Sequence, residues 1–480
     1  MIKKLIKRIV DLAPKKLSTR AARRAVDKTP HEPEIFKASK IGIDRKLASN
    51  AALRTVEDLQ KAGFRAFIVG GAVRDLLLGI RPKDFDVATD AEPEQVQRVF
   101  RRARIIGRRF RLVHVMFGPE TIEVSTFRAL QSDDVDVDEH GRVLRDNVFG
   151  EQHEDATRRD FTVNALYYDP VSDKVLDYHH GVKDLKAKVL RMIGNPDHRY
   201  REDPVRMLRA IRLSAKLGLT IDPATRKPIQ ELADLIRNVP NARLFDEMLK
   251  LLQSGNAYEG LQQLRNEGLH HGCLPLLDIV FDAQAPESEK FVTLALKATD
   301  ARIHDRKPIS PGFLFAALLW NSVRERWQQR HAAGEHLIPA LNAAIDEVTE
   351  QQLDALAIQR RYVSDMRDIW LMQPRFEKRQ GATAARLVEH LRFRAGYDFL
   401  LLRAESGQID TALADWWTDY IAADAAGRAA LVSQAAAQRS ANKSGTTGPS
   451  TTGAKRRRRR RKSAGESGSN TDANSDHHSD

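Results

Sequence analysis

Apolar and polar residues follow two different periods along the first third of the chain. Short apolar or alternating runs, typical of strands, are separated by segments in which apolar residues return at helical spacing. Such an order of elements indicates a small α/β domain with a mixed sheet. The pattern predicts strands at residues 66–69, 85–88, 110–117 and 121–127, and helices at residues 46–62, 73–78 and 92–100.

Strand signals fade further along the chain. Residues 131–157 are polar and rich in acids, which predicts a mobile insertion, and residues 158–168 predict a semi-buried helix. From about Leu185 the pattern is mostly helical, with a strong helix at residues 200–217 that Gly218 ends.

These patterns predict an α/β head with a small mixed sheet, followed by all-helical segments. The last part of the chain is rich in Ser, Gly, Thr, Ala and Arg without periodic apolar residues, which predicts disorder. The predicted divisions are a flexible basic leader (1–45), the head (46–184), a helical neck (185–260), a helical body (261–432) and a disordered Arg-rich tail (433–480).

The distribution of charge indicates that the protein binds a polyanion. The formal net charge is +13, and a run of eight basic residues carries much of it. Such a run binds a phosphate backbone by releasing its counterions, so we expect it to bind RNA; a solvated tail without a partner is the alternative. The run is Lys455, Arg456, Arg457, Arg458, Arg459, Arg460, Arg461 and Lys462.

The cysteine content and the apolar runs limit the cellular compartments in which the protein can be expected. Cys273 is the single cysteine, which excludes an intrachain disulfide and a Cys-rich zinc site and predicts a reducing compartment, the cytoplasm. No apolar run approaches the ~20 residues of a membrane span. The first residues would form a basic amphipathic helix, interpreted as a frayed extension, with membrane or RNA contact as the alternative.

Two carboxylates one residue apart are the strongest candidates for chemistry. Asp84 and Asp86 flank Phe85 at the predicted strand, and side chains two positions apart on a strand share a face. Carboxylate oxygens bind Mg²⁺, and two ions ~3.5–4 Å apart support phosphoryl transfer. Glu123, on a neighbouring predicted strand, is the candidate third carboxylate. Solvated surface acids are the alternative for this pair.

A glycine pair precedes these acids. Gly70 and Gly71 follow a predicted strand and open a helix, where backbone N–H groups can approach a phosphate without a Cβ in the way. Two glycines also commonly form only a turn. Arg74, one turn into this helix, would contact a phosphate or pair structurally with Asp75 or Asp86.

Three motifs together resemble the class II nucleotidyltransferases, the family that contains bacterial poly(A) polymerases and the enzymes that add CCA to tRNA. The motifs occur in order between residues 67 and 217: GGAVRDLLLG with DFDVATDA, then RRDFTVNALYY, then REDPVRMLRAIR. The resemblance implies a nucleotidyltransferase head followed by a helical neck and body, the same order that the apolar pattern predicts.

The resemblance also implies roles for single residues. Asp84 and Asp86 would bind Mg²⁺, and Asp160, within Arg158-Arg159-Asp160, would be essential and would help to select a ribonucleotide. Arg159 and Asn164 would join the nucleotide site with Gly70, Gly71 and Arg74. A charge cluster at a helix start is the alternative for Arg158-Arg159-Asp160.

Asp203 and Arg206 match the base-reading motif of that family. A carboxylate accepts from the amino group of adenine or cytosine and repels the carbonyl of guanine or uracil, while an arginine donates to the adjacent ring nitrogen. This pair therefore selects A or C without choosing between them. Without the resemblance, a salt bridge exposed on a helix is the simpler interpretation.

Two further features resemble the poly(A) branch of the family. Residues 106–115 read IGRRFRLVHV, and the arginine run resembles the RNA-binding tails of that branch; the acidic, His-containing end after Lys462 departs from it. The prediction is a template-independent polymerase that adds AMP from ATP to RNA 3′ ends in mRNA polyadenylation and RNA turnover, with RNA-decay or RNA-chaperone proteins as partners. The alternatives are a CCA-adding enzyme and an inactive RNA-binding protein.

Overall fold

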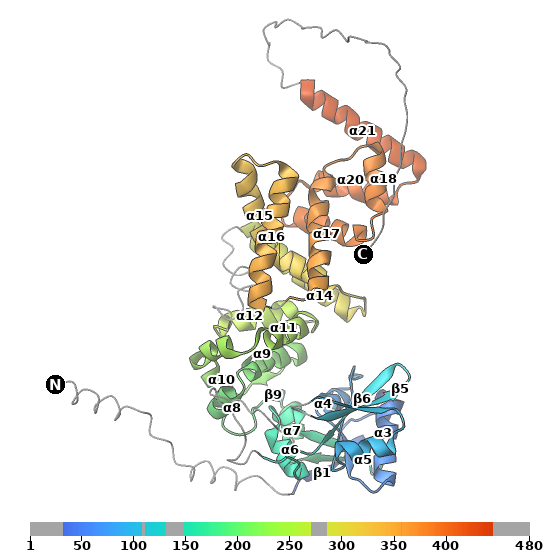
Figure 1. Ribbon diagram of the computed structural model, residues 1–480, viewed down its shortest axis with the longest axis vertical. Coiled ribbons are helices and arrows are strands. Elements are labelled where there is room, and N and C mark those ends of the chain that lie inside the picture. The colour runs from blue at the N-terminus through green and yellow to red at the C-terminus, as the bar shows by residue number, and fades with distance from the viewer. Residues whose placement is uncertain (1–31, 108–110, 131–147, 270–285, 357, 445–480) are drawn as a thin grey trace, which may run out of the picture.

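The computed structural model describes residues 32–107, 111–130, 148–269, 286–356 and 358–444 (Figure 1). An α/β head lies at one end of the molecule and a helical body at the other, with the neck helices between them. This arrangement confirms the predicted fold class.

One mixed sheet organises the head. Its strand order is β1-β8-β7-β2-β3-β6-β5-β4, and every neighbouring pair is antiparallel except β3 and β6. The strands are β1 (Glu34–Lys37), β2 (Ala66–Val69), β3 (Asp86–Thr89), β4 (Ala103–Ile106), β5 (Leu112–Phe117), β6 (Glu120–Thr126), β7 (Leu166–Asp169) and β8 (Lys174–Asp177).

Four strands of this sheet, β1, β4, β7 and β8, were not among the predicted strands. Residues 158–168 were predicted to be a helix, but β7 takes their end and pairs with β2 and β8. Its Tyr167 and Tyr168 are both buried, so the run is apolar on both faces and lacks the alternation that marks a strand. The predicted leader is also too long, because β1 pairs with β8 at the sheet edge.

The head helices are α3 (Asn50–Lys61), α4 (Gly71–Leu77), α5 (Pro93–Val99), α6 (Gln152–Arg158) and α7 (Gly181–Lys186). Apolar side chains of α3 and α5 share one core with Val113 and Val124 of β5 and β6. Helix α6 lies where a mobile insertion was predicted; Glu151 and Glu154 form a capping box that begins it. The rest of that insertion, residues 131–147, lies outside the described residues.

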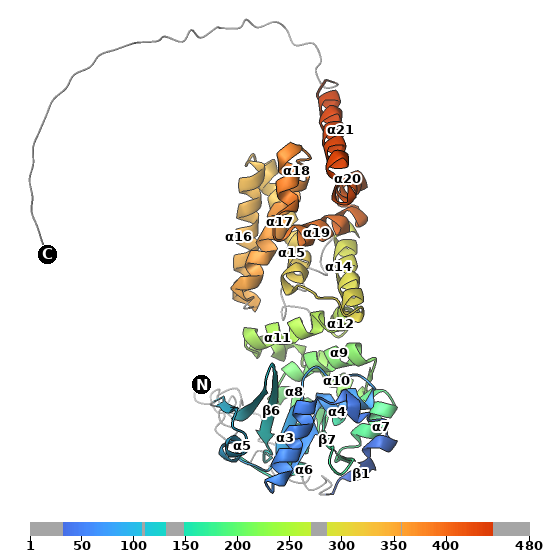
Figure 2. The ribbon, with the colours of Figure 1, turned by 90° about the vertical axis from the view of Figure 1, so that its right-hand side faces the viewer.

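The predicted helix at residues 200–217 is two helices. α8 (Pro196–Glu202) ends before Asp203, and α9 (Val205–Leu217) begins after Pro204, which has no N–H to continue the ladder of hydrogen bonds. The other neck elements are β9 (Val189–Leu190), its parallel partner β10 (Thr220–Ile221), α10 (Pro223–Glu231), α11 (Asn241–Leu252) and α12 (Ala257–Asn266). Figure 2 shows α9, α11 and α12 between the head and the body.

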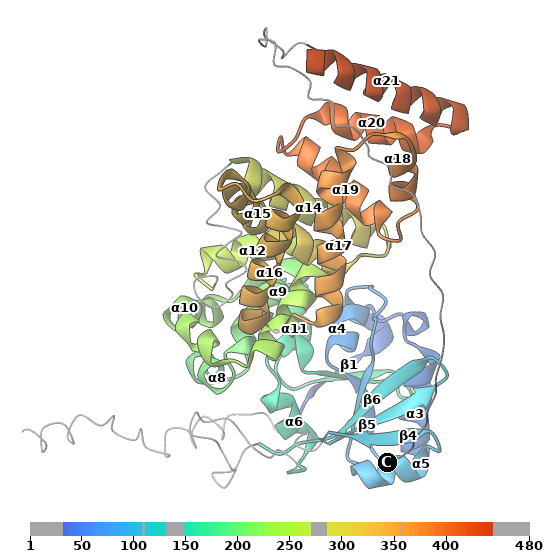
Figure 3. The same ribbon diagram turned by 45° about the horizontal axis from the view of Figure 1, so that its top comes forward.

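The body continues with α14 (Pro286–His304), α15 (Pro311–Ala332), α16 (Leu337–Leu356), α17 (Arg360–Phe376), α18 (Gly381–Val388), α19 (Phe393–Glu405), α20 (Thr411–Ala422) and α21 (Ala425–Ser444). Helix α21 lies at the end far from the head in all three views (Figure 3). It extends into the predicted disordered tail, so the prediction of disorder was wrong for residues 433–444. The basic run lies outside the described residues. Within the described residues, no helix combines the length and apolarity needed to cross a membrane.

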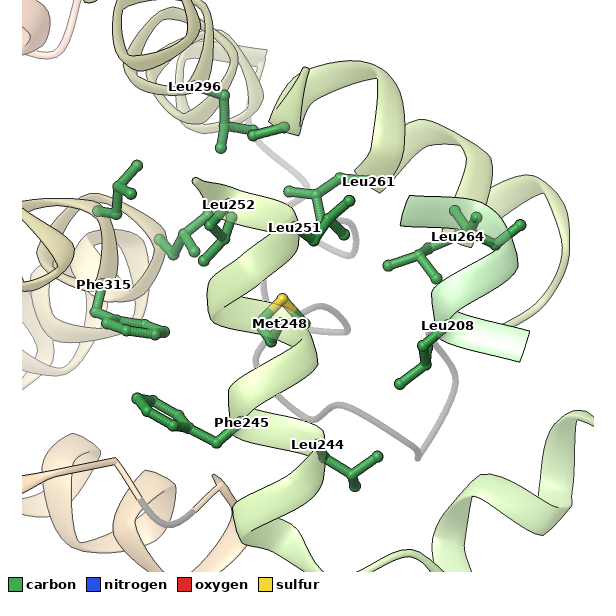
Figure 4. Packing of buried hydrophobic residues seen from close by; sticks show 14 of the residues in the cluster. Leu208, Leu244, Phe245, Met248, Leu251, Leu252, Leu261, Leu264, Leu296 and Phe315 are labelled. Carbon is green, nitrogen blue, oxygen red and sulfur yellow. The ribbon is translucent and has the colours of Figure 1, made fainter. Parts of the chain in front are cut away.

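The neck and body share a core. Helix α11 directs Phe245 toward Phe315 of α15, while Leu208 of α9 and Leu264 of α12 lie on its other side (Figure 4). The predicted boundary at residues 260–261 falls inside α12, and the boundary at residues 184–185 falls inside α7. Side chains on both sides of these positions pack into one cluster, which a single sequence does not reveal.

Candidate active site

The glycine turn at the start of α4 forms one wall of the site. Gly70 caps α4 with a φ of 71°, a conformation that disfavours residues with a Cβ. A Cβ at Gly70 would also lie 3.1 Å from Nη1 of Arg159. The turn therefore requires glycine both for its backbone conformation and for the close approach of this guanidinium.

Of the two roles considered for Arg74, contact with a phosphate or structural pairing with an acid, the structure shows the pairing, with Asp75. Its Nε and Nη2 donate to Oδ1 of Asp75 at 2.9 and 2.6 Å, and its Nη1 donates to Oδ1 of Asn164 at 2.7 Å. The side chain is only 7% exposed. Arg74 thus orients Asn164 from α4, although it also lines the pocket described below.

The two acids of the DFD motif lie around the start of β3. Asp86 begins β3, whereas Asp84 lies in the bend before it, so the two do not lie on one strand as predicted. The carboxylate of Asp86 is open to solvent but recessed among protein atoms. That partial burial and the charge of Glu123 raise the pKa of Asp86 to about 6, with a further contribution from Asp84 and an opposing one from Arg159.

Glu123 lies directly across from Asp86 in the β3–β6 register. Its Oε1, however, is 3.3 Å from Nε2 of His114. Among the described residues, no group of three acidic, His or Cys side chains is arranged to hold a metal ion. The structure thus brings Glu123 beside Asp86 without forming a three-carboxylate cluster.

The residues present nevertheless suit a divalent cation. Partial burial, followed by the negative charge of Glu123, raises the pKa of Asp86 and so disfavours its ionised form unless a cation is nearby. Oxygen ligands from Asp84 and Asp86 are of the type that Mg²⁺ prefers, and a bound cation would favour their ionised forms.

Asp160 is held in a fixed position. It accepts hydrogen bonds from the N–H of Phe161 at 2.8 Å and from Nδ2 of Asn164 at 3.1 Å, and Nη1 of Arg209 lies 3.4 Å away. Burial opposes its ionisation, but Arg209, these hydrogen bonds and Arg206 together lower the pKa of Asp160. Asp160 is therefore an ionised hydrogen-bond acceptor.

Arg159 connects the glycine turn to the sheet. Its Nε donates to the hydroxyl of Tyr167 at 3.2 Å, and its Nη2 donates to Oδ2 of Asp155 at 3.2 Å. Tyr167 donates to the same Asp155 oxygen at 2.6 Å. Although burial opposes the charge of Arg159, Tyr167 and Asp155 raise its pKa.

The break between α8 and α9 presents Asp203. Its Oδ2 accepts from Nη2 of Arg243 at 2.9 Å, while Oδ1 is buried and has no hydrogen-bond partner among the described residues. Nη1 of Arg206 donates to the carbonyl of Arg199 at 2.7 Å and to Oε2 of Glu202 at 2.8 Å. Asp203 therefore has one carboxylate oxygen without a hydrogen bond among the described residues, and Arg206 is anchored beside it.

One pocket of about 370 Å³ joins these features across the head–neck border. It includes every predicted nucleotide-binding residue and Asp86, but not Asp84 or Glu123. Its lining is Gly70, Gly71, Arg74, Asp86, Arg158, Arg159, Asp160, Asn164, Asp203, Arg206, Arg209, Arg212 and Leu213.

The sequence interpretation missed the supports of this pocket. Arg209 and Arg212 follow Arg206 at intervals of three, a spacing that places them on one helix face and could have indicated them. Arg243 and Glu247 come from α11, and nothing local in the sequence connects them to the site. Glu247 is 5% exposed and accepts from Arg209 Nε at 3.2 Å and from Arg212 Nε at 3.0 Å.

We expect Glu247→Gln to loosen the pocket and weaken the fold. Burial opposes ionisation of Glu247, but Arg212, Arg209 and Lys250 lower its pKa. The variant therefore removes the negative charge that these three cations contact. Because both arginines keep some solvent contact, the expected loss of stability is about 2 kcal/mol. Denaturant unfolding measures it, with Glu231→Gln on the exposed surface of α10 as the control; equal stability of the two variants would contradict the prediction.

Comparisons with known proteins agree along most of the chain. Residues 66–191 match the family model described as "Poly A polymerase head domain", residues 218–280 match "Probable RNA and SrmB-binding site of polymerase A", and residues 333–463 match "Polymerase A arginine-rich C-terminus".

Curated relatives show the same affiliation. Poly(A) polymerase I of Haemophilus influenzae is 46% identical over 408 residues, which cover 83% of this chain and 90% of the relative. Poly(A) polymerase I of Salmonella typhimurium is 47% identical over 388 residues, covering 79% and 83%. The CCA-adding enzyme of Bacillus subtilis is 40% identical over 213 residues, covering 44% and 52%.

Among solved structures, the Bacillus stearothermophilus CCA-adding enzyme in complex with CTP is similar to this chain. The two share 25% identity and a TM-score of 0.54, and the match covers 78% of this chain and 82% of that one.

Proposed function

The chain belongs to the bacterial poly(A) polymerase family, and from that premise we propose that it adds AMP units from ATP to RNA 3′ ends and releases pyrophosphate. The observation that carries this proposal is the pocket at the head–neck border. It is lined by Asp203, Asp160 and Asp86, the carboxylates to which we assign base reading, ribose contact and catalysis. A nucleoside triphosphate contacts such groups in that order, from base to phosphate.

Asp203 would read the base. Its unpaired Oδ1 accepts from the N6 amino group of adenine, and the carbonyl of guanine or uracil would face the same oxygen with repulsion. Arg243 donates to the other oxygen at 2.9 Å, which favours this orientation of the carboxylate. Arg206, anchored by Arg199 and Glu202, lies in the pocket to donate to a ring nitrogen.

Asp160 would accept from the ribose. Asn164, Arg209 and the N–H of Phe161 fix its carboxylate, which is held ionised and so accepts from a 2′-hydroxyl that a deoxyribonucleotide lacks. The glycine turn brings backbone N–H groups and the guanidinium of Arg159 together at the phosphate end.

Asp84 and Asp86 would hold Mg²⁺, which when bound neutralises phosphate charge and activates the attacking hydroxyl. The protein's own contribution would be to position the reactants: the pocket would hold the nucleotide with its α-phosphate next to Asp86. We also propose that the enzyme acts in the cytoplasm and with RNA-decay or RNA-chaperone proteins.

A CCA-adding activity is the second candidate, because the solved relative with CTP shares the fold and Asp203 would accept equally from cytosine. The test supplies each nucleotide singly with a tRNA that lacks its CCA end and with an unstructured RNA. We expect ATP to give long products on both RNAs and CTP to add little. Addition of CCA to the tRNA alone would establish the second candidate.

The arginine run should set the salt dependence of RNA binding. Replacing the basic residues of 455–462 by Gln keeps the tail length but removes its phosphate contacts. We expect the slope of log K against log salt to become shallower by ~0.7 for each phosphate that the tail no longer neutralises, with kcat on saturating RNA little changed. Fluorescence anisotropy with oligoadenylate at several salt concentrations measures the slope; an unchanged slope excludes RNA contact by this run.

A further inference from the structure

A second cavity lies beside the nucleotide pocket. Its volume is about 300 Å³, at the lower end of the roughly 300–1,000 Å³ typical of ligand sites. Asp86, Arg158 and Arg159 line both cavities, so they stand between the two. The other lining residues are Val69, Leu112, Glu123, Ser125, Arg128 and Asp155.

A row of polar side chains leads from this cavity to the edge of the sheet. Asp86 of β3 is paired with Glu123 of β6, Glu123 with His114 of β5, and His114 with Arg104 of β4. Residues directly opposite each other in adjacent strands share a face, so these four side chains lie on one face across three strand spacings, about 14 Å. Along the row, the charge changes from negative at Asp86 to positive at Arg104.

This face is open to solvent at its far end. Arg104 and Ile106 of β4 are exposed, whereas Ile105 between them contacts the core on the opposite face. Glu123 is 55% exposed, and His114 is 30% exposed. The residues that alternate with the row, Val113 and Val124 among them, are buried with α3 and α5.

We infer that the second cavity and the row Asp86–Glu123–His114–Arg104 form the acceptor site, which binds the 3′-terminal nucleotides of a single-stranded RNA. This inference rests on the proposed function, which places ATP in the first cavity. In nucleotidyl transfer the attacking and leaving oxygens lie roughly in line on opposite sides of the phosphorus. With ATP on one side of Asp86, the acceptor approaches from the other side, where the second cavity lies.

The chemistry of the row fits a polynucleotide strand. The terminal 3′-oxygen forms a bond to the α-phosphorus as the bond to the leaving pyrophosphate breaks, and the hydroxyl proton passes to solvent. Nε2 of His114 lies 3.3 Å from Oε1 of Glu123, which places the imidazole between Glu123 and Arg104 along the row. Arg104 then provides a cation for a phosphate several nucleotides upstream, with Ile106 beside it for apolar contact with a base.

The site is distinct from the other RNA-binding segments. The family model that mentions RNA covers residues 218–280, and the arginine run lies at residues 455–462. Neither includes the edge strand β4.

The test reverses one charge on each face of the head. Arg104→Glu changes the proposed path, and Arg98→Glu makes the same change on the exposed surface of α5, which packs on the opposite face. Both variants of the full chain extend oligoadenylate acceptors of about ten nucleotides and of two nucleotides. The shorter acceptor fills the cavity without reaching β4. Thermal unfolding confirms that both variants are folded, and Arg104→Gln supplies a milder change.

We expect Arg104→Glu to raise the KM for the long acceptor about tenfold, and Arg104→Gln about threefold, because each removes one charged interaction with a phosphate. The KM for ATP, kcat and the KM for the dinucleotide should stay unchanged, and Arg98→Glu should alter none of these. Equal effects at Arg104 and Arg98, or equal effects on both acceptors, would overturn the inference.

Failure of the proposed function has a different signature. If the unmodified protein added no AMP to any RNA, that function would be rejected. Direct anisotropy binding of the ten-nucleotide oligoadenylate would then decide the acceptor site, which requires weaker binding by Arg104→Glu than by Arg98→Glu.

Discussion

Asp86→Asn should reduce kcat for AMP addition at least about 10³-fold, because it removes a proposed Mg²⁺ ligand, and such a metal site contributes several kcal/mol to transition-state stabilisation. The amide keeps the shape of the side chain but no longer carries the charge that would bind Mg²⁺. Stability should not fall, since partial burial and Glu123 already disfavour the ionised carboxylate and raise the pKa of Asp86.

Single-turnover extension of oligoadenylate with saturating ATP and Mg²⁺ measures this loss, and thermal unfolding provides the check on folding. Asp90→Asn is the matched control, because Asp90 follows the same strand but pairs with Arg65 at 2.9 Å, away from the pocket. Near-normal extension by Asp86→Asn, or an equal loss in both variants, would show that Asp86 holds no metal in the reaction.

Asp203→Asn should remove most of the preference for ATP over GTP. The carboxylate can only accept, whereas an amide can also donate to the O6 carbonyl of guanine. Sites that pair with a substrate amino or hydroxyl group discriminate by ~10⁴–10⁵, so we expect the ratio of kcat/KM for ATP and GTP to fall by at least about 10²-fold. The KM for RNA should change little, because Asp203 lies in the nucleotide pocket.

Arg243→Gln separates base reading from packing. This variant removes the donor to Oδ2 of Asp203 but leaves the carboxylate itself in place. We expect a higher KM for ATP with the preference over GTP largely retained. If both variants lost the preference to the same extent, the discrimination would come from the shape of the α8–α9 break and not from the Asp203 carboxylate.

Local sequence signals predicted the elements that carry the chemistry. The strand at residues 66–69 has the predicted bounds, because its four apolar residues end at Gly70, whose positive φ turns the chain into α4. The motifs then indicated most of the pocket lining. They could not indicate that Asp203 sits at a break between two helices, since helical spacing continues across Pro204.

Tertiary contacts decided the rest. β7 is a strand because β2 and β8 flank it, although its sequence has no alternation. Glu247 and Arg243 reach the site only because α11 packs against α9, about 40 residues away in the sequence. Arg74 pairs with Asp75 and Asn164, a choice that the sequence left open.

The central claim is that this chain polymerises AMP on RNA without a template. Its most direct test supplies ATP alone with an unstructured RNA and follows product length and pyrophosphate together. The account predicts products that lengthen progressively, with one pyrophosphate released for each AMP added. Products that stop after a single nucleotide, or extension only of tRNA that lacks its CCA end, would contradict it.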